Sequence, residues 1–85
     1  MSYRDYHDPL YEKFRHDVRN RDGRKCKWPG CCGRKKLAVH HILPWAKFPL
    51  LRYIVSNGIT LCKKHHKVVT GKELQFAPML AGLIR

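Results

Sequence analysis

Acidic residues are scarce in this chain of 85 residues, and its central segment has none. Six Asp and Glu stand against 18 Lys and Arg, which gives a formal net charge of +12. All six acids lie outside residues 23–72, whereas that segment carries twelve of the 18 basic residues. So many positive charges repel one another unless an anion neutralises them. A purely solvated basic surface is the weaker interpretation, and we expect nucleic acid as the partner.

Long apolar runs are missing as well. No stretch approaches the roughly 18 apolar residues of a membrane span, and the polar start MSYRDYHDP is unlike a signal peptide. We therefore expect an intracellular protein without a membrane partner. The length predicts one domain over residues 1–85, with a core small enough to need a disulfide, a metal ion or a partner chain.

Four cysteines could supply that additional stabilisation. Without signs of secretion, metal ligation is favoured over two disulfides. Cys26 and Cys31 flank the turn sequence KWPG, and Cys62 precedes His65 by three positions. These C-x4-C and C-x2-H pairs supply the four ligands of a tetrahedral zinc site. Cys32 could compete with Cys31, although the Pro-Gly before Cys31 favours the latter.

Hydrophobic spacing and turn residues predict a small number of elements. Asp8 can cap a helix, Pro9 suits its first turn, and apolar side chains then recur at helical spacing. The apolar tail from Glu73 should pack on the domain or on a second copy, so it could mediate a homodimer. Between the two expected strands we predict a structured loop. The expected elements are a helix over 9–21, strands over 37–43 and 59–62, and a short helix over 63–72.

Four of the six histidines form two adjacent pairs, His40–His41 and His65–His66. Neighbours on a strand point to opposite faces, and neighbours on a helix diverge by about 100°. The members of each pair should therefore have different roles. If His65 faces the zinc ligands, His66 can meet one member of the first pair and form a second, open metal position.

Three ordered blocks, CKWPGC, LAVHHILPW and NGITLCKKHH, resemble the HNH endonuclease family, in particular its zinc-containing phage and bacterial branch. The similarity covers about residues 21–73. It implies an α+β fold of the small ββα-metal (His-Me finger) type, here with an N-terminal helix and a structural zinc knuckle. It also implies the cytoplasm of a bacterial or phage-infected cell as the location. The substrate would be duplex DNA, cut with little sequence specificity.

The resemblance further implies a metal-dependent hydrolysis of phosphodiester bonds. By position, His41 would be the general base that activates water, and His40 and His66 would hold a divalent ion. Asn57 would hydrogen-bond to the backbone across the hairpin loop and orient His41. The plainer interpretation of Asn57 is an Asn-Gly turn with Gly58, and the two roles are compatible.

Two positions depart from the family pattern. Relatives often carry Asp at the position of His40, so this site is richer in nitrogen and should favour Mn2+, Co2+, Ni2+ or Zn2+ over Mg2+. Relatives also commonly have Cys at the position of His65, and either residue closes a tetrahedral zinc site. The structural zinc set implied here is Cys26, Cys31, Cys62 and His65.

Basic side chains near these blocks should hold the duplex backbone without reading its sequence. Trp45, Phe48 and Tyr53 could stack on bases, but core packing is the stronger interpretation. The main alternative is a zinc-stabilised module that binds DNA without cutting it, which leaves the histidines of the open site without a role. A third is a zinc-stapled protein-interaction domain. The expected DNA-binding residues are Arg34, Lys35, Lys36, Lys47, Arg52, Lys63, Lys64 and Lys67.

Overall fold

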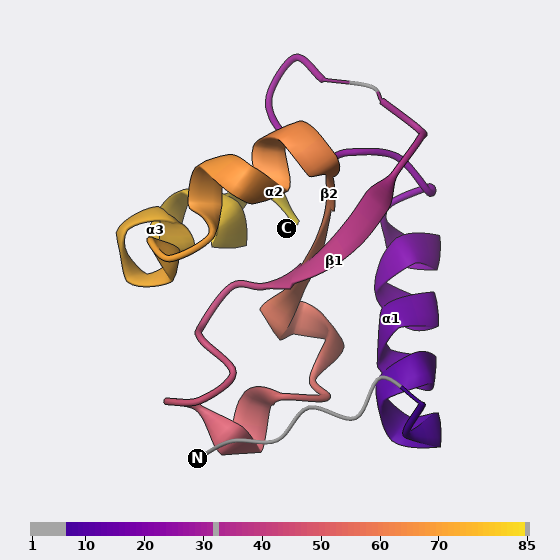
Figure 1. The fold of residues 1–85 in the computed structure, drawn as a ribbon, viewed down its shortest axis with the longest axis vertical. Coiled ribbons are helices and arrows are strands. Elements are labelled where there is room, and N and C mark those ends of the chain that lie inside the picture. The colour runs from indigo at the N-terminus through magenta and orange to yellow at the C-terminus, as the bar shows by residue number, and fades with distance from the viewer. Residues whose placement is uncertain (1–6, 32, 85) are drawn as a thin grey trace.

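A computed structural model describes residues 7–31 and 33–84 of the chain. The fold is a small α+β arrangement in which α1 lies along one side of a two-stranded antiparallel sheet and α2 and α3 lie on the other (Figure 1). None of the helices described is long and apolar enough to cross a membrane. In chain order the elements are α1 (Pro9–Arg21), β1 (Leu37–His41), the 3-10 turns η1 (Pro49–Leu51) and η2 (Val55–Asn57), β2 (Gly58–Cys62), α2 (Lys63–Val69) and α3 (Glu73–Leu83).

Helix α1 has the predicted bounds. The Asp8 side chain accepts a hydrogen bond of 2.9 Å from the Leu10 amide, which caps one of the free N–H groups of the first turn. The apolar stripe Tyr11, Phe14 and Val18 is buried against the sheet. The sequence therefore predicts the start of this helix and most of the face that it buries, but Leu10, which has the same helical spacing, is 61% exposed.

The two strands pair from Leu37 opposite Cys62 to His41 opposite Gly58. The predicted first strand, 37–43, is two residues too long. The ladder ends after His41 because the Asn57 amide bonds to the Ile54 carbonyl and the Asn57 side chain accepts from the Leu43 amide. The second strand begins one residue earlier than predicted. The interpretation of Asn57 and Gly58 as a plain turn is wrong, since Gly58 has extended backbone angles and opens β2.

Each face of the sheet covers its own apolar core. On one face, Val39 and Trp45 pack with the buried stripe of α1. On the other face, Ile59 and Leu61 pack with Val69 of α2 and with α3. Successive residues of β1 therefore point into different environments, which separates the two neighbouring histidines at its end.

The apolar tail folds back on the domain as α3, with Ala77 and Leu80 buried. Packing on the domain is one of the two alternatives that the sequence predicts; the helix, which contains Pro78, is not predicted. Pro78 is exposed, so solvent can satisfy the carbonyl that loses its partner. Helix α2 is shorter than predicted and ends before Gly71, whose φ of 81° reverses the chain. The homodimer through this tail stays a prediction.

Candidate metal centre and histidine site

Three thiols and one imidazole converge between the loop before β1 and the start of α2. The potential ligand atoms of this Cys3His cluster all lie within 4.8 Å of one another. His65 Nδ1 is 3.3 Å from Cys62 Sγ and 3.5 Å from Cys26 Sγ. Tetrahedral bonds of about 2.3 Å to sulfur and about 2.05 Å to nitrogen would place such atoms about 3.6 Å apart. The cluster, Cys26, Cys31, Cys62 and His65, can therefore hold a metal ion such as zinc.

Backbone hydrogen bonds shape the loop that carries the first two thiols. The turn predicted for KWPG forms, with the Cys31 amide bonded to the Trp28 carbonyl at 2.9 Å and Gly30 at a φ of 78°. The Cys26 amide donates to the Gly33 carbonyl at 2.8 Å. The chain thus holds its cysteines close together through its own backbone. Cys32, the competing ligand, lies outside the described residues.

The imidazole and two of the thiols occupy different environments. The ring of His65 stacks on Trp28 at 4.8 Å with an interplanar angle of 4°, which fixes its plane beside the thiols. Burial raises the pKa of the Cys26 thiol. The backbone amide of His65 lowers the pKa of Cys62, because it donates a hydrogen bond to the thiolate. Cys62 therefore loses its proton more readily than Cys26.

His40 and His66 face each other across the interface of β1 and α2. Their ring centroids are 5.5 Å apart and the rings are nearly perpendicular, at 79°. Two imidazoles that share one ion at angles of 90–110° have centroids about 4.5–5.3 Å apart. The separation of the two rings is therefore slightly larger than that of two imidazoles bound to one ion. Among residues 7–31 and 33–84, Cys3His is the one cluster of three or more potential ligands, so the histidine pair has no third protein ligand from these residues beside it.

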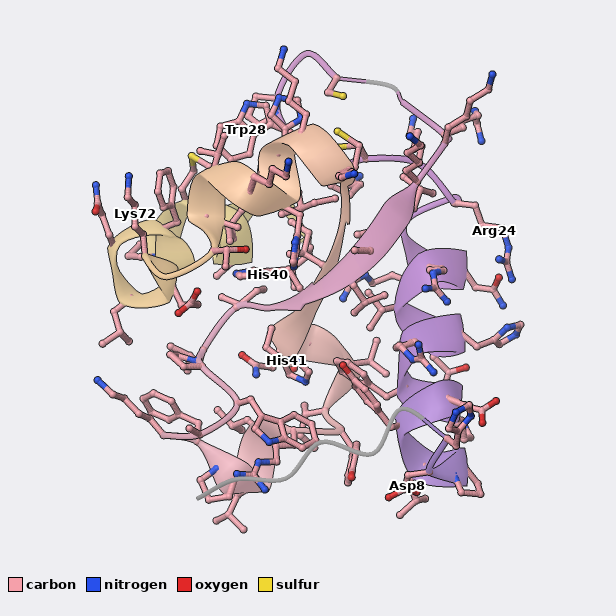
Figure 2. All side chains as sticks on the ribbon, in the orientation of Figure 1. Asp8, Arg24, Trp28, His40, His41 and Lys72 are labelled. Atoms are coloured by element: carbon pink, nitrogen blue, oxygen red, sulfur yellow. The ribbon has the colours of Figure 1, made fainter. Side chains whose placement is uncertain are left out.

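His41 lies on the opposite face of β1, toward α1 and the loop before β2 (Figure 2). Its ring stacks on Phe14 at 4.9 Å and meets the edge of Trp45 at 5.3 Å. Its Nε2 is 2.8 Å from the carbonyl oxygen of Arg52. A carbonyl can only accept, so Nε2 carries the proton and Nδ1 holds the basic lone pair. The different placement of His40 and His41 agrees with the alternation that the strand predicts.

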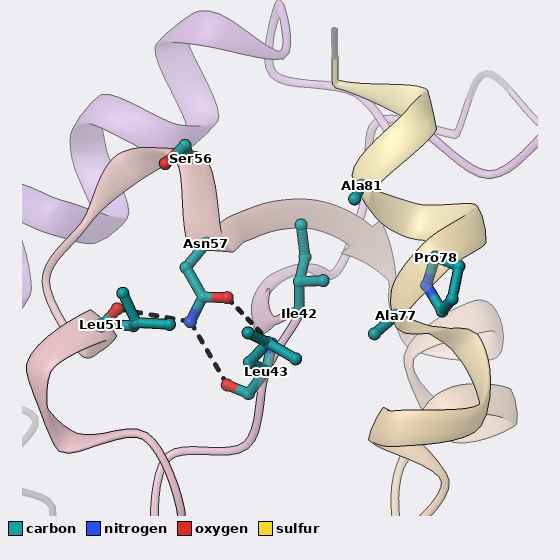
Figure 3. Close-up of a pocket in the computed structure, with 8 residues that line it drawn as sticks. All are labelled: Ile42, Leu43, Leu51, Ser56, Asn57, Ala77, Pro78 and Ala81. Carbon is teal, nitrogen blue, oxygen red and sulfur yellow. Dashed lines mark hydrogen bonds between the residues drawn. The ribbon is translucent and has the colours of Figure 1, made fainter.

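Asn57 holds the loop that fixes His41. Its Oδ1 accepts from the Leu43 amide at 2.9 Å, and its Nδ2 donates to the carbonyls of Leu43 and Leu51 at 3.2 and 3.3 Å (Figure 3). Leu51 directly precedes Arg52, the residue whose carbonyl contacts His41. Asn57 therefore bonds backbone across the loop, as expected, and reaches His41 through the chain without a direct bond.

The same loop forms one wall of a mainly apolar pocket of about 380 Å³, whose other wall is α3 (Figure 3). Its only side-chain hydrogen-bonding groups are those of Ser56 and Asn57. None of the histidines or cysteines considered above lines it. Of the candidate site residues that the structure describes, only Asn57 therefore lines the pocket.

Seven of the eight expected DNA-binding side chains are exposed, and the eighth differs. Arg52 is half-buried, and its Nε donates to the Trp45 carbonyl at 2.8 Å. Its guanidinium carbon lies 4.4 Å from the centre of the Trp45 ring. We therefore assign Arg52 to the loop that holds His41. Trp45 is buried, as core packing predicts, whereas Tyr53 is 39% exposed. The exposed seven are Arg34, Lys35, Lys36, Lys47, Lys63, Lys64 and Lys67.

One ion pair at the end of α1 is absent from the sequence-based expectations. Asp22 is only 3% exposed and accepts two hydrogen bonds from Arg21, at 2.8 and 2.9 Å. It also accepts from the Thr60 amide at 2.8 Å, and Arg21 donates to the Gly58 carbonyl. The pair therefore fastens α1 to β2. Its only sequence signal is an acid directly before the segment 23–72, which has no acidic residue.

No protein-family model, curated protein or solved structure matches this chain. Any functional assignment must therefore come from the residues themselves. Two arrangements are available for it: the Cys3His cluster and the three histidines around the end of β1.

Proposed function

We propose that this protein is a metal-dependent endonuclease of the HNH type that hydrolyses phosphodiester bonds in duplex DNA. The observation that carries the proposal is the distribution of three histidines around one strand end. His40 and His66 face each other, while His41 points to the other face with Nε2 bonded to a carbonyl. This arrangement suits two metal ligands and one base. The proposal includes zinc in the Cys3His cluster and action in the cytoplasm of a bacterial or phage-infected cell.

His41 can accept a proton at Nδ1, because the carbonyl of Arg52 holds the proton at Nε2. In the proposed reaction the oxygen of water forms a bond to phosphorus, and His41 takes its proton. The P–O3′ bond breaks, and the leaving oxygen takes a proton from solvent to give a 3′-hydroxyl and a 5′-phosphate. His40 and His66 would hold the divalent ion, which when bound supplies Lewis-acid stabilisation of the developing charge. The exposed lysines and Arg34 would hold the phosphate backbone.

One observation favours a second candidate, a zinc-stabilised module that binds DNA without cutting it. His40 and His41 are each only 5% exposed. A general base must reach the water that it activates, so catalysis needs the loop around Trp45 to open far enough to admit water and a phosphate. The two candidates share the zinc site and the basic surface, and they differ only in whether DNA is cut.

Plasmid cleavage with a panel of divalent ions separates them. Zinc-replete protein is incubated with supercoiled DNA and Mn2+, Mg2+, Co2+, Ni2+ or additional Zn2+. We expect cleavage that His40→Ala and His66→Ala each abolish, while His7→Ala, at an exposed histidine, cleaves normally. His40→Asp should retain some activity and shift the preference toward Mg2+, because carboxylate oxygen suits the harder ion. No cleavage with any ion, from protein that still binds DNA, would select the non-catalytic module.

A further inference from the structure

Three arginines lie close together at the C-terminal end of α1. We name them the α1 arginine patch: Arg19, Arg24 and Arg34. The Arg24 amide donates to the Arg19 carbonyl at 2.9 Å. Arg34 follows the loop that carries Cys26 and Cys31. Its Nη1 donates to the Gly23 carbonyl at 3.1 Å, which brings it back to the end of α1. Figure 2 shows Arg24 beside the end of α1, on the opposite side of the molecule from Lys72.

No acid of the described segments neutralises this patch. The two ion pairs of the described segments join Lys13 with Asp17 and Arg21 with Asp22, and neither involves a patch arginine. Partial burial and the nearby guanidinium groups of Arg15 and Arg24 lower the pKa of Arg19. Like charges therefore lie close together here without an acidic partner among the described residues, and an anion from outside would reduce their repulsion.

The backbone at Arg24 is a second, independent observation. Its φ of 54° lies in the left-handed region, which few residues other than glycine and asparagine adopt. Its Nη2 lies 3.4 Å from His16 Nδ1. Among residues 7–31 and 33–84, the one further non-glycine residue with positive φ is Lys36, which lies after the loop that carries Cys26 and Cys31. Both strained positions carry a basic side chain, where glycine would cost less.

We propose that the α1 arginine patch binds the phosphate backbone of duplex nucleic acid, as a contact surface separate from the lysines of α2. That the nucleic acid is a duplex rests on the proposed function. Guanidinium groups match phosphate oxygens with paired hydrogen bonds. Helices α1 and α2 lie on opposite sides of the sheet (Figure 1). The patch and the lysines of α2 therefore offer basic side chains to a long polyanion on both sides.

The surroundings of the patch favour nucleic acid over a membrane surface. Peripheral membrane binding combines basic residues with exposed apolar side chains that enter the lipid. None of the large exposed apolar side chains of the described residues falls within 19–34. Two of these exposed apolar side chains lie at α1, and both are away from the patch. Leu10 is at the N-terminal end of the helix, and Tyr53 packs beside Tyr11.

Arg24→Gly tests the proposal, because it should affect folding and binding in opposite directions. Glycine relieves the left-handed strain, so we expect a Tm that is unchanged or raised by up to about 5 °C. Binding of a random-sequence 20-bp duplex is measured by fluorescence anisotropy over a salt series, in calcium, with the full zinc-replete chain. The log–log salt slope should become shallower by about 1. Arg24→Asn, which tolerates the same backbone, should do likewise.

Lys72→Ala is the matched control, because it removes one charge that belongs neither to the patch nor to the lysines assigned to the phosphate backbone, so it should leave the slope unchanged. An Arg24→Gly slope equal to that of the wild type would overturn the patch while leaving the proposed nuclease intact. An equal loss in Lys72→Ala would also overturn it, because net charge alone would then explain binding. Wild-type protein that binds phosphatidylserine vesicles but no duplex would refute the proposed function itself.

Discussion

Gly58→Ala should destabilise the protein, although alanine normally suits extended backbone better than glycine. At a φ of −121° alanine would gain about 0.5–1 kcal/mol from the lower entropy of the unfolded chain. Its Cβ, however, would lie 2.7 Å from Val18 Cγ2 and 2.8 Å from Phe14 Cζ, and both side chains are fully packed in the α1 core. Overpacking of this kind costs about 1–3 kcal/mol, so we expect a net loss of about 1–2 kcal/mol.

Thermal unfolding of the zinc-replete protein measures this effect, with an expected fall in Tm of about 4–16 °C. Gly82→Ala is the matched control, because nothing lies within 4 Å of its added Cβ and the residue is helical. That change should raise stability by up to about 1 kcal/mol. Phe14 stacks on His41, so Gly58→Ala should also displace the imidazole. A Gly58→Ala Tm at or above the wild-type value would refute the close packing of α1 on β2.

Three further predictions concern the contacts that hold the small domain together. Asp22→Ala should lower the urea-unfolding free energy by about 2–4 kcal/mol, less than a fully buried pair would lose, because the Arg21 side chain remains 26% exposed. A loss below about 0.5 kcal/mol would show that the pair does not fasten α1. Cys62→Ser should abolish stoichiometric zinc binding and unfold the chain, as measured by metal analysis and circular dichroism, and a folded, metal-free variant would contradict this. In the wild type, zinc affinity should rise with pH up to at least about pH 9, because burial raises the pKa of the Cys26 thiol above its ordinary value of 9.0 and its proton must leave before zinc binds; an affinity independent of pH would argue against thiolate ligands.

Spacing rules predict the parts of this molecule that depend on local chemistry. The C-x4-C and C-x2-H pairs identify the four members of the Cys3His cluster, because tight turns bring each pair together whatever the rest of the fold does. Strand alternation likewise separates His40 from His41. In each case the relevant geometry spans only a few residues and is set by the backbone period.

Contacts between distant segments are what the sequence does not predict. Gly58 looks like half of an Asn-Gly turn, and its real reason is the approach of α1 from forty residues earlier. Arg52 counts as one more surface cation until its contact with Trp45 is seen. Asp22 similarly gains its importance from Thr60 across the fold. Each of these residues has a plausible local explanation, which hides its long-range role.

His41→Gln provides the most direct test of the proposed nuclease. Gln can still donate a hydrogen bond to the Arg52 carbonyl and fill most of the space between Phe14 and Trp45, but it has no basic nitrogen. Cleavage of supercoiled plasmid by wild type and variant is compared at equal zinc content and equal duplex affinity. We expect the wild type to cut and the variant to lose at least about 100-fold in rate, the usual contribution of a general base. Equal cleavage by both proteins would contradict the assignment of His41 as the base.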